Sequence, residues 1–404
     1  MTRGIDDPTA RPSPAGDLAR LRGADLLAFL LAEGATVAPN LDRGELLAAY
    51  FRHRLERGDT IVVEGAFELL AEGFGFVRSA HLDYEASPHD AFLSPSQVRA
   101  LNLKTGLRLR GPVRLPRGNE RFFALTHIDQ VADGPPTALM GALAFTARTP
   151  VVATRPLVLP SEPAVWRTLA TLTPWCRGQR VLIEAPAAWP RGPWLSSLAS
   201  ALVAANPGVC CLVTLLDQRP EDLQAAKALA AANPAIEVVG SSFDQPPERH
   251  QALAEFMLAR AMREVEGGRD VVLLVDSLTA LTLATQRAHA ASGRWLCPGV
   301  DVRAVQPGKK LFAAARAGAE GGSLTVIATA IPENSAVANA VLSEFAGRGN
   351  AEVVIPAPAD GEATPVRFDA RRTRTRPEDD SRSAAEKQAA AACRAHLATA
   401  PPEN

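Results

Sequence analysis

The sequence lacks an excess of positive charge. Its 404 residues carry 43 Lys and Arg against 44 Asp and Glu, a formal net charge of -1. A protein that coats nucleic acid through its overall field is strongly basic, so this balance excludes that class. Any nucleic-acid contact would have to come from a local patch.

Closely spaced cysteines and long apolar runs are also missing. None of the five cysteines has the Cys-x-x-Cys spacing of a metal or redox site, so we expect reduced, buried thiols. No stretch of 18 apolar residues is free of Pro, Arg or Asp, and residues 1–16 contain no apolar segment typical of a signal peptide. These absences predict a soluble, cytoplasmic protein without a membrane segment.

The N-terminal part changes pattern twice. Residues 1–16 contain prolines and mixed charges and are expected to form a flexible leader, whereas residues 17–57 carry apolar side chains at helical spacing. That spacing predicts a small helical bundle. In residues 60–131, five short apolar runs are broken by Gly, Pro, Asn and Asp, which predicts a small β-barrel of the oligonucleotide-binding type.

The C-terminal part has a different architecture. After a linker at residues 132–165, apolar strand runs alternate with helical stretches through residues 166–376. This alternation predicts a parallel α/β sheet with ligands at the carboxyl ends of its strands. The polar, alanine-rich tail at residues 377–404 is expected to form one loose helix or to be disordered. The predicted fold class is multidomain α/β.

One strand of the barrel carries an aromatic pattern. Phe74 and Phe76 are two residues apart and so emerge on one face, and Arg78 continues that face. Flanking glycines leave room for bases to lie flat on the rings, and each stacked base contributes about 1 to 3 kcal/mol. The alternative is that both rings belong to the barrel core, but glycine beside each ring is a poor choice for packing alone.

A local basic patch accompanies these rings. Between Asp90 and Arg121 only Asp90 and Glu120 oppose the basic residues Arg99, Lys104, Arg108, Arg110, Arg114, Arg117 and Arg121. Such a patch attracts phosphate. The alternative interpretation is a solvated charged face.

Several sequence blocks, in one order, resemble bacterial transcription termination factor Rho. The blocks are Glu-Gly-Phe-Gly-Phe-Val-Arg-Ser at 72–79 and those at 90–99, 102–106, 120–125, 178–180, 216–221, 242–244, 248–250, 276–277, 299–301 and 320–324. The resemblance covers roughly residues 20–376. It implies a cold-shock-like OB-fold barrel followed by a RecA-like ATPase core, in a hexameric RNA-dependent ATPase and helicase that uses ATP and Mg²⁺.

The resemblance also implies partners and contact residues. The partners are single-stranded, pyrimidine-rich RNA, RNA polymerase and further Rho subunits. The positions that match the family's primary RNA site are Phe74, Phe76, Arg78, Asp90, Phe92, Glu120, Arg121 and Phe122, and Arg99 adds a nearby charge. Arg294 matches a lysine of the first translocation loop, whereas the second loop, at residues 331–337, is one residue shorter and has no Lys or Arg.

The chain departs from the family at its phosphate loop. A working loop needs Gly-Lys-Thr/Ser, which supplies backbone N–H groups and an ammonium to the phosphates and a hydroxyl to Mg²⁺. Here the triplet is Pro190, Arg191 and Gly192. Proline has no N–H, the planar Arg fork does not replace a compact ammonium, and Gly192 has no hydroxyl. Trp189 and Trp194 add bulk beside the loop.

A second departure lies after the next strand. Gln218 stands in place of the family's catalytic glutamate, and an amide cannot accept a proton, although it can still orient water. Asp276, at the end of a buried strand, matches a carboxylate that holds Mg²⁺ or its water. The alternative for Asp276 is a helix N-cap before Ser277.

Four basic residues of this part match family positions. Arg372 and Arg376 match arginines that reach a neighbouring subunit's nucleotide, and Arg219 and Lys309 match further family positions. Surface ion pairing is the alternative for the last two.

Two functions remain open. The first is a Rho-like RNA-binding protein with an impaired ATPase core, which occupies RNA or modulates authentic Rho rings. The second is an active, divergent Rho that terminates transcription with an unusual nucleotide site. The degenerate loop favours the first, and Asp276, Arg372 and Arg376 favour the second.

Overall fold

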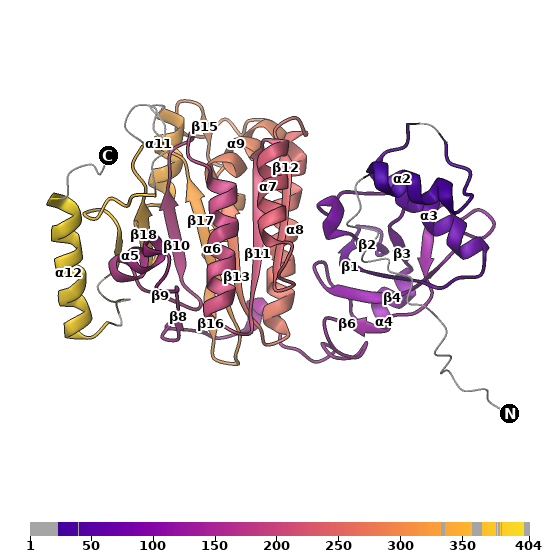
Figure 1. The fold of residues 1–404 in the computed structure, drawn as a ribbon, viewed down its shortest axis with the longest axis horizontal. Helices are drawn as coiled ribbons and strands as arrows, with labels where there is room; N and C mark the ends of the chain where they lie inside the picture. The colour runs from indigo at the N-terminus through magenta and orange to yellow at the C-terminus, as the bar shows by residue number, and fades with distance from the viewer. Residues whose placement is uncertain are drawn as a thin grey trace. The chain divides into compact units, whose positions relative to one another are not determined.

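The computed structural model describes residues 23–38, 40–332, 336–357, 366–376, 378, 380 and 382–399. The predicted leader and the last residues of the tail lie outside these ranges. The chain divides into two compact units, Met1–Gly141 and Ala142–Asn404, and each is considered by itself. Figure 1 shows the elements of both units.

The first unit opens with two helices, α2 (Gly23–Ala32) and α3 (Arg43–Glu56). A capping box fixes the start of α3, because the Asp42 side chain accepts from the Glu45 amide while the Glu45 side chain accepts from the Asp42 amide. Ser94 and Gln97 form the same motif at α4 (Pro95–Ala100). A short 3-10 turn, η1 (Ala80–Leu82), follows β2.

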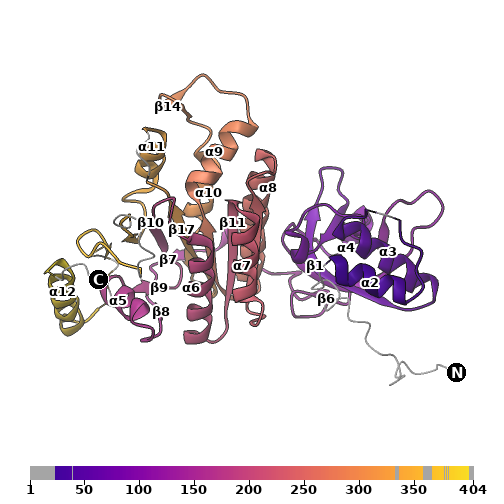
Figure 2. The same ribbon diagram turned by 45° about the horizontal axis from the view of Figure 1, so that its top comes forward.

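These helices accompany a six-stranded sheet of order β1-β2-β3-β5-β4-β6 that closes through pairing of β1 with β4. Figure 2 shows α2, α3 and α4 of this unit together with β1 and β6. The strands are β1 (Ile61–Leu69), β2 (Gly75–Arg78), β3 (Ala91–Leu93), β4 (Arg108–Arg114), β5 (Phe123–Leu125) and β6 (Gln130–Val131). The predicted OB-like barrel is therefore confirmed. The short strand β6 was not predicted.

Strand register aligns a row of side chains across the barrel. Phe76 on β2 pairs with Phe92 on β3, Phe92 pairs with Ala124 on β5, and Ala124 pairs with Arg114 on β4. Side chains at paired positions point to the same face of a sheet. The opposite face of these strands is buried in the barrel core through residues such as Val77 and Leu93.

The second unit is built on a sheet whose central order is β12-β11-β13-β17-β10-β18-β19. All pairings from β12 to β18 along this path are parallel. These strands are β10 (Arg180–Glu184), β11 (Val209–Gln218), β12 (Ile236–Ser242), β13 (Asp270–Asp276), β17 (Ser323–Ala330), β18 (Ala351–Val354) and β19 (Arg374–Thr375). The parallel α/β core is confirmed.

Short strands complete the second unit. They are β7 (Pro150–Val151), β8 (Pro156–Leu157), β9 (Trp175–Cys176), β14 (Trp295–Cys297), β15 (Val300–Asp301) and β16 (Arg316–Gly318). A further 3-10 turn is η2 (Phe145–Ala147). The strand β16 joins the main sheet beside β17 and also pairs with β7.

Helices cover the sheet on both faces (Figure 1). One buried cluster joins α5 (Ala164–Leu172), α6 (Arg191–Ala205) and α7 (Pro220–Ala230) to one set of strand side chains. The buried side chains of α8 (Pro247–Glu266), α9 (Leu278–Ala288) and α10 (Gln306–Ala313) are not part of that cluster. They pack against the other face, so the central strands are apolar on both sides.

The tail forms α12 (Ala384–Thr399), and α11 (Ala336–Phe345) precedes β18. Arg394 of α12 donates to the carbonyl oxygens of Leu172 and Thr373, so the tail helix is fixed to the second unit. Within the described residues, no helix is long and apolar enough to cross a membrane.

Candidate functional sites

The outer face of the barrel carries a cluster of four phenylalanines. The Phe76 ring is central, with centroid distances of 5.9 Å to Phe74, 5.9 Å to Phe92 and 4.9 Å to Phe122. Phe76 is 6% exposed, whereas Phe122 is 42% exposed. The buried cluster that fills the barrel contains none of the four, although Phe76 is itself buried.

Arg78 lies against this cluster rather than in solvent. Its guanidinium carbon is 4.9 Å from the Phe76 ring centroid, and its nitrogens pair with Glu68 at 2.7 Å and Asp90 at 2.5 Å. The Asp90 Oδ2 also accepts from the Ser87 amide at 2.6 Å. Burial raises the pKa of Asp90 to about 6, an effect that Arg78 opposes.

Asp90 retains one unused acceptor. Its Oδ1 atom is buried and has no hydrogen-bond partner among the described residues, and the whole residue is 2% exposed. Buried polar atoms normally have a partner, so an orphaned acceptor in a native structure requires an explanation. A bound molecule that donates a hydrogen bond would supply one.

The basic patch is smaller than the sequence predicted. Arg108 pairs with Asp133, and Arg114 holds Glu120 with two hydrogen bonds of 2.6 and 2.8 Å. The Arg114 contact holds the pKa of Glu120 at about 2. In the described part of the chain, no ion pair joins the remaining members of the patch, which are Arg99, Lys104, Arg110, Arg117 and Arg121.

In the second unit, the segment at residues 185–190, which the sequence matches to a phosphate loop, follows β10 and ends where α6 begins. Arg191, the first residue of α6, turns its side chain back into the loop. Its Nη1 donates to the carbonyl oxygens of Pro186 at 3.1 Å and Ala187 at 2.8 Å. A phosphate-binding loop directs N–H groups at its ligand, whereas these two carbonyls bind a cation from the protein itself.

The same arginine reaches Asp276. Arg191 Nε donates to Asp276 Oδ1 at 2.8 Å, and Thr329 donates to the same oxygen at 2.6 Å. Gln218 Nε2 donates to the other oxygen, Oδ2, at 3.0 Å. Asp276 is fully buried. The arrangement thus neutralises a buried carboxylate with partners from three other segments of this chain.

These contacts revise two interpretations. Asp276 is not the N-cap of α9, because Ser277 has that position and its hydroxyl accepts from the Ala280 amide. Gln218 Nε2 donates to both Asp276 and the Leu216 carbonyl, and these two hydrogen bonds fix the amide group. Thr329 was missed by sequence reasoning. The only signal for it was its position near the end of the buried strand β17.

Tryptophan rings pack beside the loop. The Trp189 and Trp194 ring centroids are 4.9 Å apart, and Trp166 of α5 lies 5.5 Å from Trp194. Trp194 is buried and its indole nitrogen has no partner among the described residues. The bulk expected from the sequence therefore forms a cluster of tilted rings at the start of α6.

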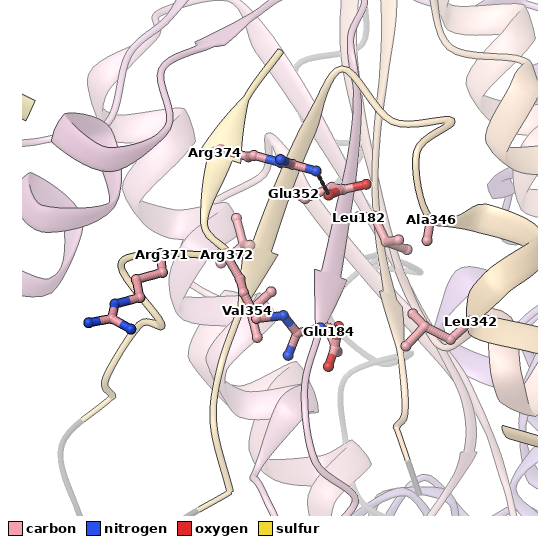
Figure 3. Close-up of a pocket in the computed structure, with 10 residues that line it drawn as sticks. Leu182, Glu184, Leu342, Ala346, Glu352, Val354, Arg371, Arg372 and Arg374 are labelled. Atoms are coloured by element: carbon pink, nitrogen blue, oxygen red, sulfur yellow. Dashed lines mark hydrogen bonds and ion pairs between the residues drawn. The ribbon is translucent and has the colours of Figure 1, made fainter. Parts of the chain in front are cut away.

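The matched arginines of the C-terminal segment pair with carboxylates of their own chain. Arg372 pairs with Glu184 of its own chain at 2.6 Å, beside a cavity of about 300 Å³ that is also lined by Leu182, Leu342, Glu352 and Arg374. Figure 3 shows Arg372 directed towards Glu184 and Arg371 directed away.

Three further basic residues have different surroundings. Arg376 lies 3.9 Å from Glu378, a loose ion pair. Lys309 pairs with Glu344, as the surface interpretation predicts. Arg219 is exposed at the start of α7, and its side chain forms no ion pair with the residues that the structure describes.

Arg294 lies at the base of the β14–β15 hairpin. Asp301 braces this hairpin by accepting from the Ser292 amide at 2.6 Å and the Arg303 amide at 2.8 Å. A cavity of about 440 Å³ is lined by Ser292, Arg294, Val302, Arg303 and Gln306. Sequence reasoning missed the neighbouring Trp295, which is 53% exposed. The second loop, at residues 331–337, lies partly outside the described residues.

Comparisons with known proteins agree with the barrel geometry. Residues 63–137 match the family described as Rho termination factor, RNA-binding domain. The chain is 35% identical to transcription termination factor Rho of Chromobacterium violaceum over 83% of this chain and 81% of that protein. It is also 35% identical to the Haemophilus influenzae protein of the same name, over 91% of this chain and 86% of that protein.

Solved structures resemble the chain at the level of fold. An ATPase of the type III secretion system of pathogenic bacteria aligns with a TM-score of 0.52 and 21% identity, covering 72% of this chain and 79% of that chain. The assembled ATPase EscN, in complex with its stalk EscO from enteropathogenic E. coli, aligns with a TM-score of 0.51 and 17% identity, covering 83% and 86%. These likenesses establish a RecA-like ATPase fold.

Proposed function

Because the chain belongs to the Rho family of RNA-binding transcription termination factors, we propose that it binds single-stranded RNA but has lost efficient ATP hydrolysis. It acts as a non-catalytic relative of Rho that occupies RNA or modulates authentic Rho rings. The observation that carries this proposal is the internal saturation of Asp276 by Arg191, Thr329 and Gln218.

The barrel supports the RNA-binding half. The rings of Phe122, Phe92 and Phe74 give bases a surface for stacking. The buried Phe76 ring packs against all three of these rings. The buried, unpaired Asp90 Oδ1 accepts a hydrogen bond from a base edge, which satisfies that atom. Neither feature needs a basic protein, in keeping with the net charge of -1.

The α/β unit supports the loss of hydrolysis. Mg²⁺ prefers oxygen ligands and keeps several waters, but both oxygens of Asp276 have protein donors and a guanidinium lies 2.8 Å away. Gly192 offers no hydroxyl in compensation. We therefore infer that these residues do not fit a Mg²⁺–nucleotide complex.

Gln218 does not supply the candidate site with a general base. Gln218 donates its amide hydrogens to Asp276 and Leu216, so the amide is held by the protein and cannot take a proton from water. Arg372 is held by Glu184 of its own chain, which reduces its availability to a neighbouring subunit. A hexamer, either of this chain or mixed with authentic Rho, remains part of the proposal.

The proposal is tested on the full-length protein by two assays on one preparation. Radiolabelled ATP is incubated with and without poly-cytidine RNA, and RNA affinity is measured by fluorescence anisotropy. We expect RNA binding without phosphate release. RNA-stimulated release that Asp276→Asn abolishes would instead establish the alternative, an active and divergent Rho. Absence of RNA binding would reject the first half of the proposal.

A further inference from the structure

The sheet of the second unit carries a mixed apolar and acidic surface on one face of β10 and β18. Strand register pairs Leu182 with Glu352 and Glu184 with Val354, so these four side chains form a square in which the two residue types alternate. The cavity of about 300 Å³ lies over this square and is bordered by Leu342 of α11 (Figure 3). Its volume is at the lower end of the range for small-molecule pockets.

Arg372 and Glu184 place opposite charges side by side in this cavity. Arg372 Nη2 donates to Glu184 Oε2 at 2.6 Å, and this is the only hydrogen bond of either charged group to the described residues. The Glu184 side chain is 14% exposed, whereas the Arg372 side chain is 55% exposed. The ion pair therefore leaves acceptor positions free on the more buried carboxylate and N–H donors free on the more exposed guanidinium.

The turn that carries Arg372 is held in place by the rest of the chain. Asp369 Oδ1 accepts from the Arg372 amide at 3.1 Å. Arg394 of α12 donates to the carbonyl oxygens of Ala370 at 3.1 Å and Thr373 at 3.0 Å, on both sides of Arg372. The backbone at Arg372 is thus fixed before any ligand arrives, which lowers the entropic cost of binding.

The charges of the cavity favour a ligand that carries both signs. A second ion pair, between Arg374 and Glu352 at 3.6 Å, lines the same cavity, so the two pairs balance and attract neither a simple anion nor a simple cation. An α-amino acid has its ammonium and carboxylate on one carbon, and these two groups are as close to each other as the charges of an ion pair. They can bind to the free positions of Glu184 and Arg372 without separating that pair.

We propose that this cavity binds a free α-amino acid with an aliphatic side chain. The ammonium donates to Glu184 Oε1, the carboxylate accepts from the guanidinium of Arg372, and the side chain covers the apolar residues Leu182, Leu342 and Val354. This role differs from the contact with a neighbouring subunit's nucleotide that the family resemblance implies for Arg372. It goes beyond the proposed function and depends on neither RNA binding nor ATP.

The test is isothermal titration calorimetry of the full-length protein with L-leucine and two analogues. Isoamylamine lacks the carboxylate of leucine, and isocaproate lacks its ammonium. We expect leucine to bind saturably and at least about tenfold more tightly than either analogue, because each analogue loses one hydrogen bond between charged groups.

Substitutions then assign each charge of the ligand to its partner. Glu184→Gln should weaken leucine binding about tenfold and change isocaproate binding less than twofold, whereas Arg372→Gln should weaken both. Arg371→Gln is the matched control, because the Arg371 side chain is directed away from Glu184 (Figure 3), and it should leave leucine affinity unchanged. Circular dichroism identifies any unfolded variant, and Arg372→Lys then provides a second variant that keeps the charge.

Four results would overturn the inference. Absence of saturable leucine binding at millimolar concentration rejects the site. Equal affinity for leucine and either analogue shows that one of its two charges is not recognised, and leucine binding that survives in folded Glu184→Gln places the ligand elsewhere. The fourth is a failure to bind leucine together with a loss of self-association in Glu184→Gln, measured by sedimentation, which would mean that the cavity receives a second copy of this chain.

Discussion

The side chains of Arg191 and Asp276 form a 2.8 Å ion pair across the edge of the parallel sheet, between the start of α6 and the end of β13. Asp276 is fully buried and the Arg191 side chain is 12% exposed. Removing one partner of a buried ion pair strands a charge away from water, which is more costly than the pair's net contribution to folding. The folding stability of the second unit therefore depends on both residues of this pair.

Arg191→Met should therefore destabilise the second unit by about 3 kcal/mol. Asp276→Asn in addition should restore part of the loss, because it removes the stranded charge. All five tryptophans are in this unit, so urea unfolding followed by tryptophan fluorescence reports on it selectively. An unfolding midpoint of Arg191→Met equal to that of the wild type would show that the ion pair does not stabilise this unit.

Phe76 and Phe122 should separate stability from RNA affinity. Phe76→Ala removes the buried centre of the cluster, so we expect a loss of about 3 kcal/mol in barrel stability together with weaker RNA binding. Phe122→Ala removes a half-exposed ring and should cost about 1 to 3 kcal/mol in affinity with little effect on stability. Hydrogen exchange of β1 peptides and RNA anisotropy measure the two effects. Equal destabilisation by both variants would refute the distinction.

The salt dependence of RNA binding should be moderate. Arg78, Arg108 and Arg114 are held in ion pairs with carboxylates. The phosphate contacts are therefore left to the five other basic residues of the patch, which are Arg99, Lys104, Arg110, Arg117 and Arg121. Because each phosphate contact to a single strand contributes about -0.7 to the slope of log K against log salt, we expect a slope no steeper than about -3.5 from the barrel. Anisotropy titrations from low to high KCl measure it. A slope near -5 would mean that the paired arginines also contact phosphate.

His89 should make the barrel sensitive to acid. Its imidazole is 7% exposed, lies 2.6 Å from the Ser87 hydroxyl and packs against Phe51. Burial, helped by Arg43 and Arg78, lowers the pKa of His89 from 6.5 to about 4. The unfolded chain therefore takes up this proton first, and stability is lost as the pH falls from about 6.5 to 4, by about 3 kcal/mol.

The control for that prediction is His89→Gln, which cannot titrate. Its stability profile should differ from that of the wild type by this pH-dependent term, because the other titrating groups are common to both proteins. Hydrogen exchange of β1 peptides in urea, corrected for intrinsic rates, gives both profiles. Parallel profiles between pH 7 and pH 4 would show that His89 binds its proton as readily in the folded barrel as in the unfolded chain.

Sequence patterns predicted the elements of the barrel well. Each of the five predicted strands lies at or beside an observed strand, since glycine, proline and asparagine mark the turns between them. The two-residue strand β6 has too few residues for a periodic signal. The partner of Arg108, Asp133, follows β6, so the sequence could not reveal that this arginine is paired.

The arrangement of residues around Asp276 was predicted only in part. Residue types alone predicted that Pro190 offers a nucleotide no N–H and that Gly192 offers it no hydroxyl, because that prediction depends only on missing atoms. The inward turn of Arg191 depends on the orientation of two loop carbonyls, which no residue pattern encodes. Gln218 and Asp276 are 58 residues apart in sequence, and they meet because β11 and β13 are parallel neighbours with Leu215 beside Asp276.

The shared carboxylate of Asp276 bears on how this chain can change over generations. Arg191 and Gln218 both depend on Asp276, so the substitution of one residue alters the value of the others. Replacing Arg191 with lysine gives up the guanidinium's separate contacts to Asp276 and to the two loop carbonyls. Pro190 still withholds an N–H, so this change loses stability without supplying a phosphate loop. Conversion of this segment to a Gly-Lys-Thr/Ser loop therefore requires several simultaneous changes, because the side chains around Asp276 are tied to one another.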